Sequence, residues 1–353
     1  ETLNLPMSKL RCLTPSVGAG FGNKMEAHVQ PIVVKLALKT ERPVKLILTR
    51  EEDFEMIRAR HPARIRCKTG ARKDGVLLAR EVEVLMDGGA YADDSPGVLG
   101  ISILFSRGPY RIPNVRSSGQ VVYTNHLRFA AFRGFGNPQI NFATEAQIDE
   151  IAQKLDLDPI EVRLKNAMDT GDTWFGGQVV ESNGLKECIT KVREASNWER
   201  ESDRKGKNRK GKQRGLGISI AGHISGILGT GAIVRLLEDG TVILNTGATD
   251  IGQGSDTVLS QICAETLQVP LQNISLASPD TDGSPFNWGT TASRVTYTTG
   301  RAVVGAAKEV EKKIKNAASQ MLECRVDDLE LLPGGKLGII GVPGHEVTFF
   351  EVA

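Results

Sequence analysis

The 353-residue sequence has few cysteines, no long apolar run and almost no net charge. Its five cysteines are far apart, and no two of them have the C-x-x-C spacing of a self-contained iron–sulfur or zinc site. Scattered thiols predict reduced cysteines in a cytoplasmic protein rather than a disulfide framework. The apolar runs fall short of the ~20 residues that a membrane-spanning helix needs. A formal charge of +2 on so long a chain argues against general nucleic-acid binding.

Glycine, in contrast, is abundant and clustered, with 38 of the 353 residues against a usual share of ~7%. Glycine-rich segments at 18–23, 131–139 and 247–255, and a hydroxyl-rich one at 290–296, each precede a predicted helix. Glycine serves where the backbone takes a positive φ or must approach another group closely. Free N–H groups at a helix start favour an anion. Four such helix starts predict loops that converge on one large, polar, phosphate-bearing cofactor.

Neither of two familiar phosphate-binding motifs fits the first of these segments. A dinucleotide fingerprint would need glycine or alanine where Asn23 stands, and no βαβ unit follows it. A P-loop would need a serine or threonine directly after Lys24. The segment therefore predicts an anion without specifying a nucleotide.

Strands and helices alternate along both halves of the chain. Apolar periodicity predicts helices over 27–38, 139–155, 255–267 and 301–315, and another that begins at Pro159 after an Asp158 N-cap. Other patterns predict strands at 9–13, 44–48, 64–70, 78–86 and 216–221, and a hairpin of 232–238 with 241–245. This alternation predicts an α+β (α/β) fold of mixed sheets with packed helices.

A charged stretch divides the chain into two predicted lobes. Residues 199–214 contain no apolar side chain, and no aromatic residue is interspersed among the charges. We interpret this stretch as a solvated linker rather than as a basic arm for nucleic acid. The predicted domains are a first lobe at 1–198 and a second lobe at 215–353 that is incomplete at its C-terminus.

The four segments together resemble the molybdopterin-binding part of the xanthine dehydrogenase / aldehyde oxidase family of molybdenum hydroxylases. The similarity is carried by Gly18-Ala19-Gly20-Phe21-Gly22-Asn23-Lys24, Ala131-Phe132-Arg133-Gly134-Phe135-Gly136, Asp250-Ile251-Gly252-Gln253-Gly254 and Thr291-Ala292-Ser293-Arg294. These segments come in the family's order and approximate spacing, and the similarity extends over essentially the whole chain. The resemblance implies the family's two-lobed molybdenum-cofactor-binding domain.

The resemblance also implies which residues contact the cofactor. The dithiolene of molybdopterin, and no side chain of this protein, would hold the molybdenum, in agreement with the lack of a Cys/His cluster in the sequence. The implied cofactor-binding residues are Gly20, Phe21 and Gly22 opposite the metal, Arg133 and Gly134 in the loop beside the substrate, and Ile251, Gly252, Gln253, Gly254, Thr291, Ala292, Ser293 and Arg294 around the pterin and its phosphates.

Several residues are candidate substrate contacts. Phe135 matches an aromatic platform for a flat ring, and Arg133 is expected to stabilise charge that develops on the substrate. His223 and Ser225 lie in a glycine-rich loop and Glu26 follows the first segment. The alternatives are an ordinary core aromatic for Phe135 and a surface histidine for His223.

Departures from the family bear on the substrate. Purine-hydroxylating members carry a glutamate where this chain has Met25, and an arginine where it has Ile101. The copper-binding cysteine of the carbon monoxide dehydrogenases has no counterpart in 133–136. We therefore expect an aromatic, heteroaromatic or aldehyde substrate, oxidised with oxygen that comes from water.

The family's general base is a glutamate in a Gly-Glu-Pro tripeptide, and the sequence contains no such tripeptide. We expect this base C-terminal to the chain and no catalytic residue within it, so that the chain is an interior piece of a longer subunit. General-base catalysis usually supplies roughly 10²–10⁴-fold in rate, and the chain alone is therefore expected to be inactive.

The implied cofactor is molybdopterin in its cytosine dinucleotide form. The implied partners are a [2Fe-2S] subunit, an FAD-binding subunit and the remainder of the molybdopterin subunit, in a cytoplasmic dimer of heterotrimers. Two alternatives remain open at this point. One is a non-catalytic scaffold of the same fold, and the other is a nucleotide-phosphate-binding enzyme of unrelated chemistry.

Overall fold

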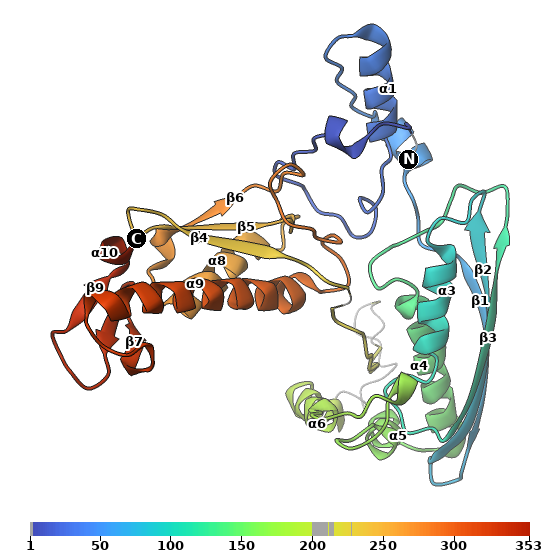
Figure 1. Cartoon of the computed structure of the whole chain (residues 1–353). Helices are drawn as coiled ribbons and strands as arrows, with labels where there is room; N and C mark the ends of the chain where they lie inside the picture. The colour runs from blue at the N-terminus through green and yellow to red at the C-terminus, as the bar shows by residue number, and fades with distance from the viewer. Residues whose placement is uncertain (1–2, 200–210, 212–214, 227) are drawn as a thin grey trace. The chain divides into compact units, whose positions relative to one another are not determined.

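The computed structural model describes residues 3–199, 211, 215–226 and 228–353. The predicted linker 199–214 lies, apart from Glu199 and Gly211, outside the described residues. The chain forms two compact units, each of which is described by itself (Figure 1). Unit 1 comprises Glu1–Gly20, Lys24–Ile47 and Ile224–Ala353, and unit 2 comprises Phe21–Asn23 and Leu48–His223. The lobes at 1–198 and 215–353 were defined from sequence pattern and stay a prediction.

Unit 2 is built on a three-stranded sheet. Strand β1 (Ala63–Ala71) pairs antiparallel with β2 (Leu77–Gly89), and β3 (Asn114–Tyr123) runs parallel to β2. Helices α3 (Ser95–Leu104) and α4 (Asn137–Leu155) pack along one face of this sheet (Figure 1). The unit is completed by α2 (Arg50–Met56), α5 (Pro159–Asn166), η2 (Phe175–Gly177) and α6 (Leu185–Ala195). The strand predicted at 78–86 is confirmed as β2, in which every second side chain from Val82 to Met86 is buried.

Unit 1 holds two further three-stranded sheets. In the first, β4 (Ala232–Leu236) and β5 (Val242–Thr246) form the predicted hairpin, and β6 (Ile274–Ala277) runs parallel to β5. Helices α8 (Ser255–Leu267) and α9 (Gly300–Met321) pack against each other in the core of the unit. The second sheet contains β7 (Leu329–Leu332), β8 (Lys336–Ile339) and β9 (Glu346–Thr348).

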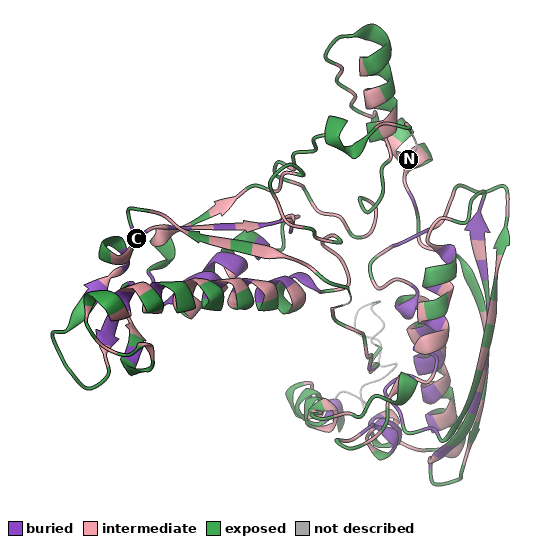
Figure 2. Ribbon diagram, viewed as in Figure 1, coloured by how far each residue is buried: buried purple, intermediate pink, exposed green. Residues whose placement is uncertain are grey.

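Short elements complete unit 1. They are η1 (Met7–Lys9), α1 (Gln30–Thr40), η3 (Leu271–Asn273), the π-helical turn η4 (Val295–Thr299), η5 (Val326–Asp328) and α10 (Phe349–Val352). Helix α1 has no buried residue, whereas α9 carries buried side chains along its length (Figure 2). Among the helices that the structure describes, none combines the length and the apolar character needed to cross a membrane.

The predicted helices are confirmed, with ends that differ by up to about six residues. The start of α5 follows the expected chemistry, since the Asp158 carboxylate accepts hydrogen bonds from the N–H groups of Ile160 at 2.7 Å and Glu161 at 3.2 Å. Proline at the first helical position adds to the same signal. The mixed sheets with packed helices confirm the predicted α+β class.

Three predicted strands were wrong. Residues 9–13, 44–48 and 216–221 form no ladder within the described structure, and Leu13 makes only an isolated bridge to Asp280. Segment 216–221 shows the reason. The N–H group of Ile220 donates to a carboxylate oxygen of Glu145 at 2.8 Å instead of to a neighbouring strand. An apolar pattern predicts burial, but a strand also needs a partner for its backbone groups.

Candidate functional site

The four segments that carry the resemblance, 18–24, 131–136, 250–254 and 291–294, are called the first to fourth motifs below. Several of their residues have a left-handed backbone conformation. Non-glycine residues with positive φ occur in three of the four motifs, and they are Ala19 (66°), Phe21 (54°), Phe135 (48°), Ala292 (48°) and Ser293 (49°). Each such residue costs about 1–3 kcal/mol and persists only where the surrounding structure enforces it. Backbone of this kind clusters at ligand sites, so its coincidence with the motifs supports a site there.

In unit 2, the second half of the first motif packs against the second motif. The N–H group of Arg133 donates to the carbonyl oxygen of Phe21 at 2.8 Å. A Cβ atom at Gly22 would lie 2.3 Å from the carbonyl oxygen of Ala131, so this approach requires glycine. The Arg133 guanidinium lies 5.6 Å from the centre of the exposed Phe21 ring. Phe21, Gly22 and Arg133, for which the family resemblance implies contact with the cofactor, therefore lie together.

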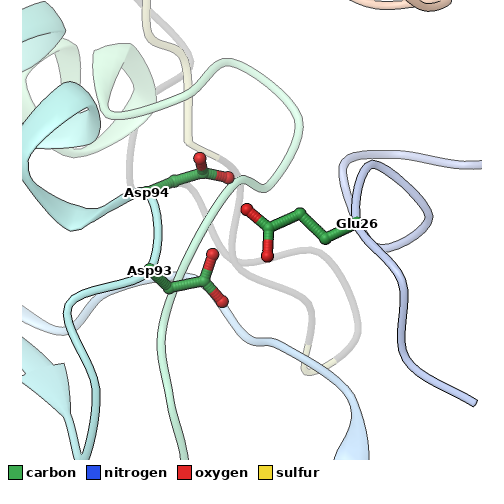
Figure 3. A group of neighbouring side chains, drawn as sticks. All are labelled: Glu26, Asp93 and Asp94. Atoms are coloured by element: carbon green, nitrogen blue, oxygen red, sulfur yellow. The ribbon is translucent and has the colours of Figure 1, made fainter. Parts of the chain in front are cut away.

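The sequence did not identify the two arginines that hold these loops. Arg58 is fully buried, and its guanidinium donates to the carbonyl oxygen of Gly22 at 3.0 Å and to Asp93 and Asp94 at 2.9 and 3.2 Å. Figure 3 shows the two aspartates at the turn before α3; Glu26, drawn with them, belongs to unit 1. Arg60 donates to the carbonyl oxygen of Arg133 at 2.7 Å. The sequence signal that could have indicated these two residues is the density of basic side chains at 58–64.

The loop that carries Phe135 lies directly on helix α3. A Cβ atom at Gly97 would lie 3.2 Å from two carbons of the Phe135 ring. A Cβ atom at Gly136 would lie 2.2 Å from the carbonyl oxygen of Val98. The approach to Val98 therefore requires glycine at position 136, whereas a Cβ atom at Gly97 would make a tight contact that displaces the Phe135 ring by a few tenths of an ångström.

In unit 1, segments from distant parts of the sequence meet. The N–H group of Ala19 donates to the carbonyl oxygen of Ile251 at 3.0 Å. The Thr290 hydroxyl donates to the carbonyl oxygen of Thr249 at 2.6 Å. The Ser225 hydroxyl donates to the carbonyl oxygen of Ser293 at 2.8 Å. The first half of the first motif, the third motif and the fourth motif therefore lie side by side.

The third motif satisfies most of its own polar groups. The Gln253 side chain folds back, accepting from the N–H of Ile251 at 2.7 Å and donating to the Ser255 hydroxyl at 2.8 Å. The Asp250 carboxylate accepts from the N–H groups of Gly252 at 2.7 Å and Asp256 at 3.1 Å. Asp250 is thus the anion at the N-terminus of α8, a place where the sequence predicted a phosphate.

This position sets the pKa of Asp250. Partial burial raises the pKa, but the N–H groups of Gly252, Asp256 and Gly254 outweigh it, so the net shift is downward from the usual 3.8. Asp256 next to it has a pKa raised by burial and by the charge of Asp250. The two carboxylates therefore contribute to stability with opposite signs.

We expect Asp250→Asn to lower the melting temperature most above pH ~4. A carboxyl whose folded pKa is depressed adds stability above its unfolded pKa of ~3.9, and this stability is lost as the pH falls through the folded pKa. Thermal unfolding at several pH values measures the difference from the unchanged protein. Asp256→Asn is the control, with a difference of opposite sign. If the melting temperature of Asp250→Asn lay below that of the unchanged protein by the same amount from pH 7 to pH 3, the result would contradict this account.

In the fourth motif, the backbone offers free N–H groups and the arginine side chain binds neighbouring loops. The N–H groups of Ala292 and Ser293 face no hydrogen-bond acceptor within the described chain, and successive free N–H groups in a turn suit an anion. Arg294 is fully buried. Its guanidinium donates to the carbonyl oxygens of Leu228, Gly229 and Gly289 and to the Asn287 side chain, at 2.9 to 3.2 Å. Arg294 therefore holds loops together.

Open backbone in unit 1 fits a bulky ligand. Gly252, Gly254 and Gly289 have φ values of +99°, +80° and +124°, and a Cβ atom at any of them would meet nothing within 4 Å. The positive φ by itself favours glycine at these three positions, and the space beside them is open within the described chain. Together with the free N–H groups of Ala292 and Ser293, they fit a flat, phosphate-bearing cofactor.

Gly134 stays a candidate cofactor-binding residue and Glu26 a candidate substrate contact. Gly134 has φ +94° in the second motif, and Glu26 is exposed in unit 1.

The chain is similar to proteins that bind molybdopterin. Residues 1–167 and 191–353 each match a family model described as a molybdopterin cofactor-binding domain. The chain is 36% identical over 347 residues to the xanthine dehydrogenase molybdenum-binding subunit of Escherichia coli O157:H7, covering 95% of this chain and 46% of that subunit. It is 43% identical over 193 residues to the nicotinate dehydrogenase large molybdopterin subunit of Eubacterium barkeri, covering 54% of this chain and 45% of that subunit.

A solved structure gives the same result for the fold. The crystal structure of quinoline 2-oxidoreductase from Pseudomonas putida 86 superposes with a TM-score of 0.89 at 29% identity, covering 98% of this chain and 47% of that one. The chain thus spans under half the length of the relatives that it matches.

Proposed function

Because the chain belongs to the xanthine dehydrogenase / aldehyde oxidase family of molybdopterin-binding proteins, we propose that it holds the cofactor in a molybdenum-dependent hydroxylase or dehydrogenase. The observation that carries the proposal is the meeting of distant motifs in unit 1, where Ala19 bonds to Ile251 and Thr290 to Thr249. When bound, the molybdenum cofactor supplies the two-electron oxidation and the use of oxygen from water.

Residues of unit 1 would hold the pterin and its phosphates. The N–H groups of Ala292 and Ser293 would donate to a phosphate, and Thr291 would add a hydroxyl. Gly20 and the stretch 251–254 would let the pterin approach the backbone. Arg294 would act indirectly, because its guanidinium already bonds to the carbonyl oxygens of neighbouring loops. The cytosine dinucleotide form of the cofactor is part of this proposal.

Residues of unit 2 would contact the substrate or border the metal. Phe21, Gly22 and Gly134 would border the metal, and Phe135 would stack on the ring of the substrate. The exposed Arg133 would stabilise negative charge that develops on the substrate during oxidation.

We propose an aromatic, heteroaromatic or aldehyde substrate. Nicotinate dehydrogenase and quinoline 2-oxidoreductase are named for nitrogen-containing aromatic rings, which supports the heteroaromatic class. Met25 and Ile101 stand where the purine-hydroxylating members carry a glutamate and an arginine, which argues against a purine substrate.

Electrons would leave through [2Fe-2S] and FAD groups on partner subunits of a cytoplasmic dimer of heterotrimers. The general base would lie on the remainder of the molybdopterin subunit, and Glu26 and His223 would contact the substrate.

The proposal is tested by analysing what the protein binds. The full chain is purified from cells that make molybdenum cofactor, and molybdenum, oxidised-pterin fluorescence and released cytosine nucleotide are measured. We expect pterin and cytosine nucleotide in equal amounts below one per chain, and no turnover. A preparation with neither would support a scaffold, and a nucleotide without pterin would support unrelated chemistry; either result would overturn the proposal.

A matched pair of variants connects the binding to the loops. Thr290→Val removes the hydrogen bond to Thr249, and a typical bond is worth ~1 kcal/mol, or about fivefold in bound pterin. Thr266→Val is the control, since its hydroxyl bonds only to the carbonyl oxygen of Ile262 within α8. Equal pterin content in the two variants would contradict the role given to the Thr290 loop.

A further inference from the structure

His223 stands at the edge of an aromatic cluster in unit 2. Its ring stacks on Phe105, with 5.7 Å between ring centres and 29° between ring planes. Phe105 in turn contacts the edges of Trp174 and Phe175 at 6.1 and 5.5 Å between ring centres. Phe105 is buried, whereas His223 is exposed. The cluster therefore gives the imidazole a fixed apolar support on one face and leaves it accessible from outside.

Gly222 permits this arrangement. A Cβ atom at position 222 would lie 2.7 Å from the far end of the Trp174 indole. The indole thus occupies the space that any larger residue would fill, and it lies against the backbone directly before His223. This contact limits where the backbone that carries the imidazole can lie.

Asn137 fixes the hydrogen bonding of the imidazole. Its side chain is buried, and its Nδ2 atom donates to the carbonyl oxygen of Gly222 at 2.7 Å. This bond settles the orientation of the amide, because only the nitrogen can face a carbonyl oxygen. The same Nδ2 atom lies 3.2 Å from Nδ1 of His223. Since an amide nitrogen can only donate, Nδ1 must be the acceptor and must carry no proton.

The proton of the neutral ring then lies on Nε2. Packing against the cluster removes part of the hydration of the ring, which lowers the pKa of His223 below its usual 6.5. The imidazole is therefore neutral at pH 7, in agreement with an unprotonated Nδ1. Within the described residues, Nε2 has no hydrogen-bond partner. The result is an exposed Nε2–H donor beside an aromatic surface.

We propose that Asn137 is a positioning residue that fixes His223 as the Nε2–H tautomer, and that this N–H recognises an acceptor atom on a flat heteroaromatic ring. Asn137 is the first residue of α4 and lies two residues after Phe135, the proposed ring platform in the loop that packs on α3. The ligand class follows from the chemistry: a donor selects rings that carry an acceptor such as a ring nitrogen. The statement about the substrate rests on the proposed function, whereas the tautomer does not.

The tautomer is measured directly by ¹⁵N nuclear magnetic resonance. In the labelled full chain at pH 7, we expect the His223 signals of an unprotonated Nδ1 and a protonated Nε2, assigned by their loss in His223→Gln. An Nδ1–H tautomer or a charged ring in the unchanged protein would overturn the proposal. Because this measurement needs neither cofactor nor turnover, a protein without molybdenum but with the expected tautomer would refute only the proposed function.

Substitution at Asn137 tests its role as the cause. In Asn137→Asp, a carboxylate faces Nδ1 and can only accept, so we expect a proton on Nδ1 and a raised pKa for His223. Asn141→Asp introduces the same charge one turn further along α4 and should leave the Nε2–H tautomer in place. The same tautomer in both variants would overturn the positioning role. If Asn137→Asp does not fold, the signals of the unchanged protein still decide.

Recognition is tested with two probes of one shape. Quinoline has a ring nitrogen that accepts a hydrogen bond, and naphthalene has none. We expect quinoline to shift the Nε2 signal of His223 in titrations, naphthalene to leave it unchanged, and His223→Phe to bind the two probes alike. Equal effects of quinoline and naphthalene on Nε2, or no effect of quinoline, would overturn the part of the proposal that concerns the ligand.

Discussion

Replacing Gly136 by alanine is expected to lower the free energy of unfolding of unit 2 by about 2–5 kcal/mol, the sum of left-handed strain and overpacking. Gly136 is the N-cap of α4 and has φ +93°. The added Cβ atom would lie 2.2 Å from the carbonyl oxygen of Val98 and 2.6 Å from the Ser102 hydroxyl. The Ser102 hydroxyl donates to the carbonyl oxygen of Gly136 at 2.8 Å, so a movement of the loop away from α3 would weaken this hydrogen bond.

Gly171→Ala is the matched control for this change. Gly171 belongs to the same unit and has nearly the same φ, +91°, but a Cβ atom there meets nothing within 4 Å. Gly171→Ala should therefore lower the free energy of unfolding only by the backbone strain of about 1–2 kcal/mol. Urea unfolding of both variants measures the difference. Equal losses of stability would show that the contact with α3 contributes nothing and that conformation alone explains the glycine.

The second large effect is expected at Glu145. Its buried carboxylate accepts from the Tyr110 hydroxyl at 2.6 Å, from Nε of Arg163 at 3.0 Å and from the N–H of Ile220 at 2.8 Å. Burial, followed by the charge of Glu145, raises the pKa of Tyr110, so the phenol stays protonated and donates. Glu145→Gln keeps the shape but removes the charge opposite a buried arginine. Breaking such a pair costs about 3–5 kcal/mol.

Asp149→Asn is the control, because Asp149 bonds to the same arginine at 2.8 Å but has a side chain 48% exposed. An ion pair at such a position is worth only ~0–1 kcal/mol. Chemical unfolding, followed by the fluorescence of Trp198 and Trp174 in the same unit, compares the two. A loss at Asp149 as large as that at Glu145 would show that the exposed half of the pair carries the stability. Because Glu145 bonds to Ile220, its loss should also release segment 216–221.

Local signals in the sequence were reliable predictors of helices and of glycine loops. Asp158 and Pro159 predicted the start of α5, because capping involves groups only two or three residues apart. The strands predicted at 64–70 and 78–86 are confirmed as β1 and β2, whose antiparallel register depends on a short turn. Strand predictions failed at 44–48 and 216–221, where the decisive requirement was a distant partner.

The sequence by itself determined the family, the fold class and the positions of the four motifs, because these depend on short patterns of residue types. Tertiary structure alone decided that Asp250 holds the N-terminus of α8, that Arg294 is buried among carbonyl groups, and that Arg58 and Asn137 support the site. Asn137 and His223 are 86 positions apart in the chain. A hydrogen bond between them follows from how helices and loops pack, and packing is a property of the whole fold that no local pattern encodes.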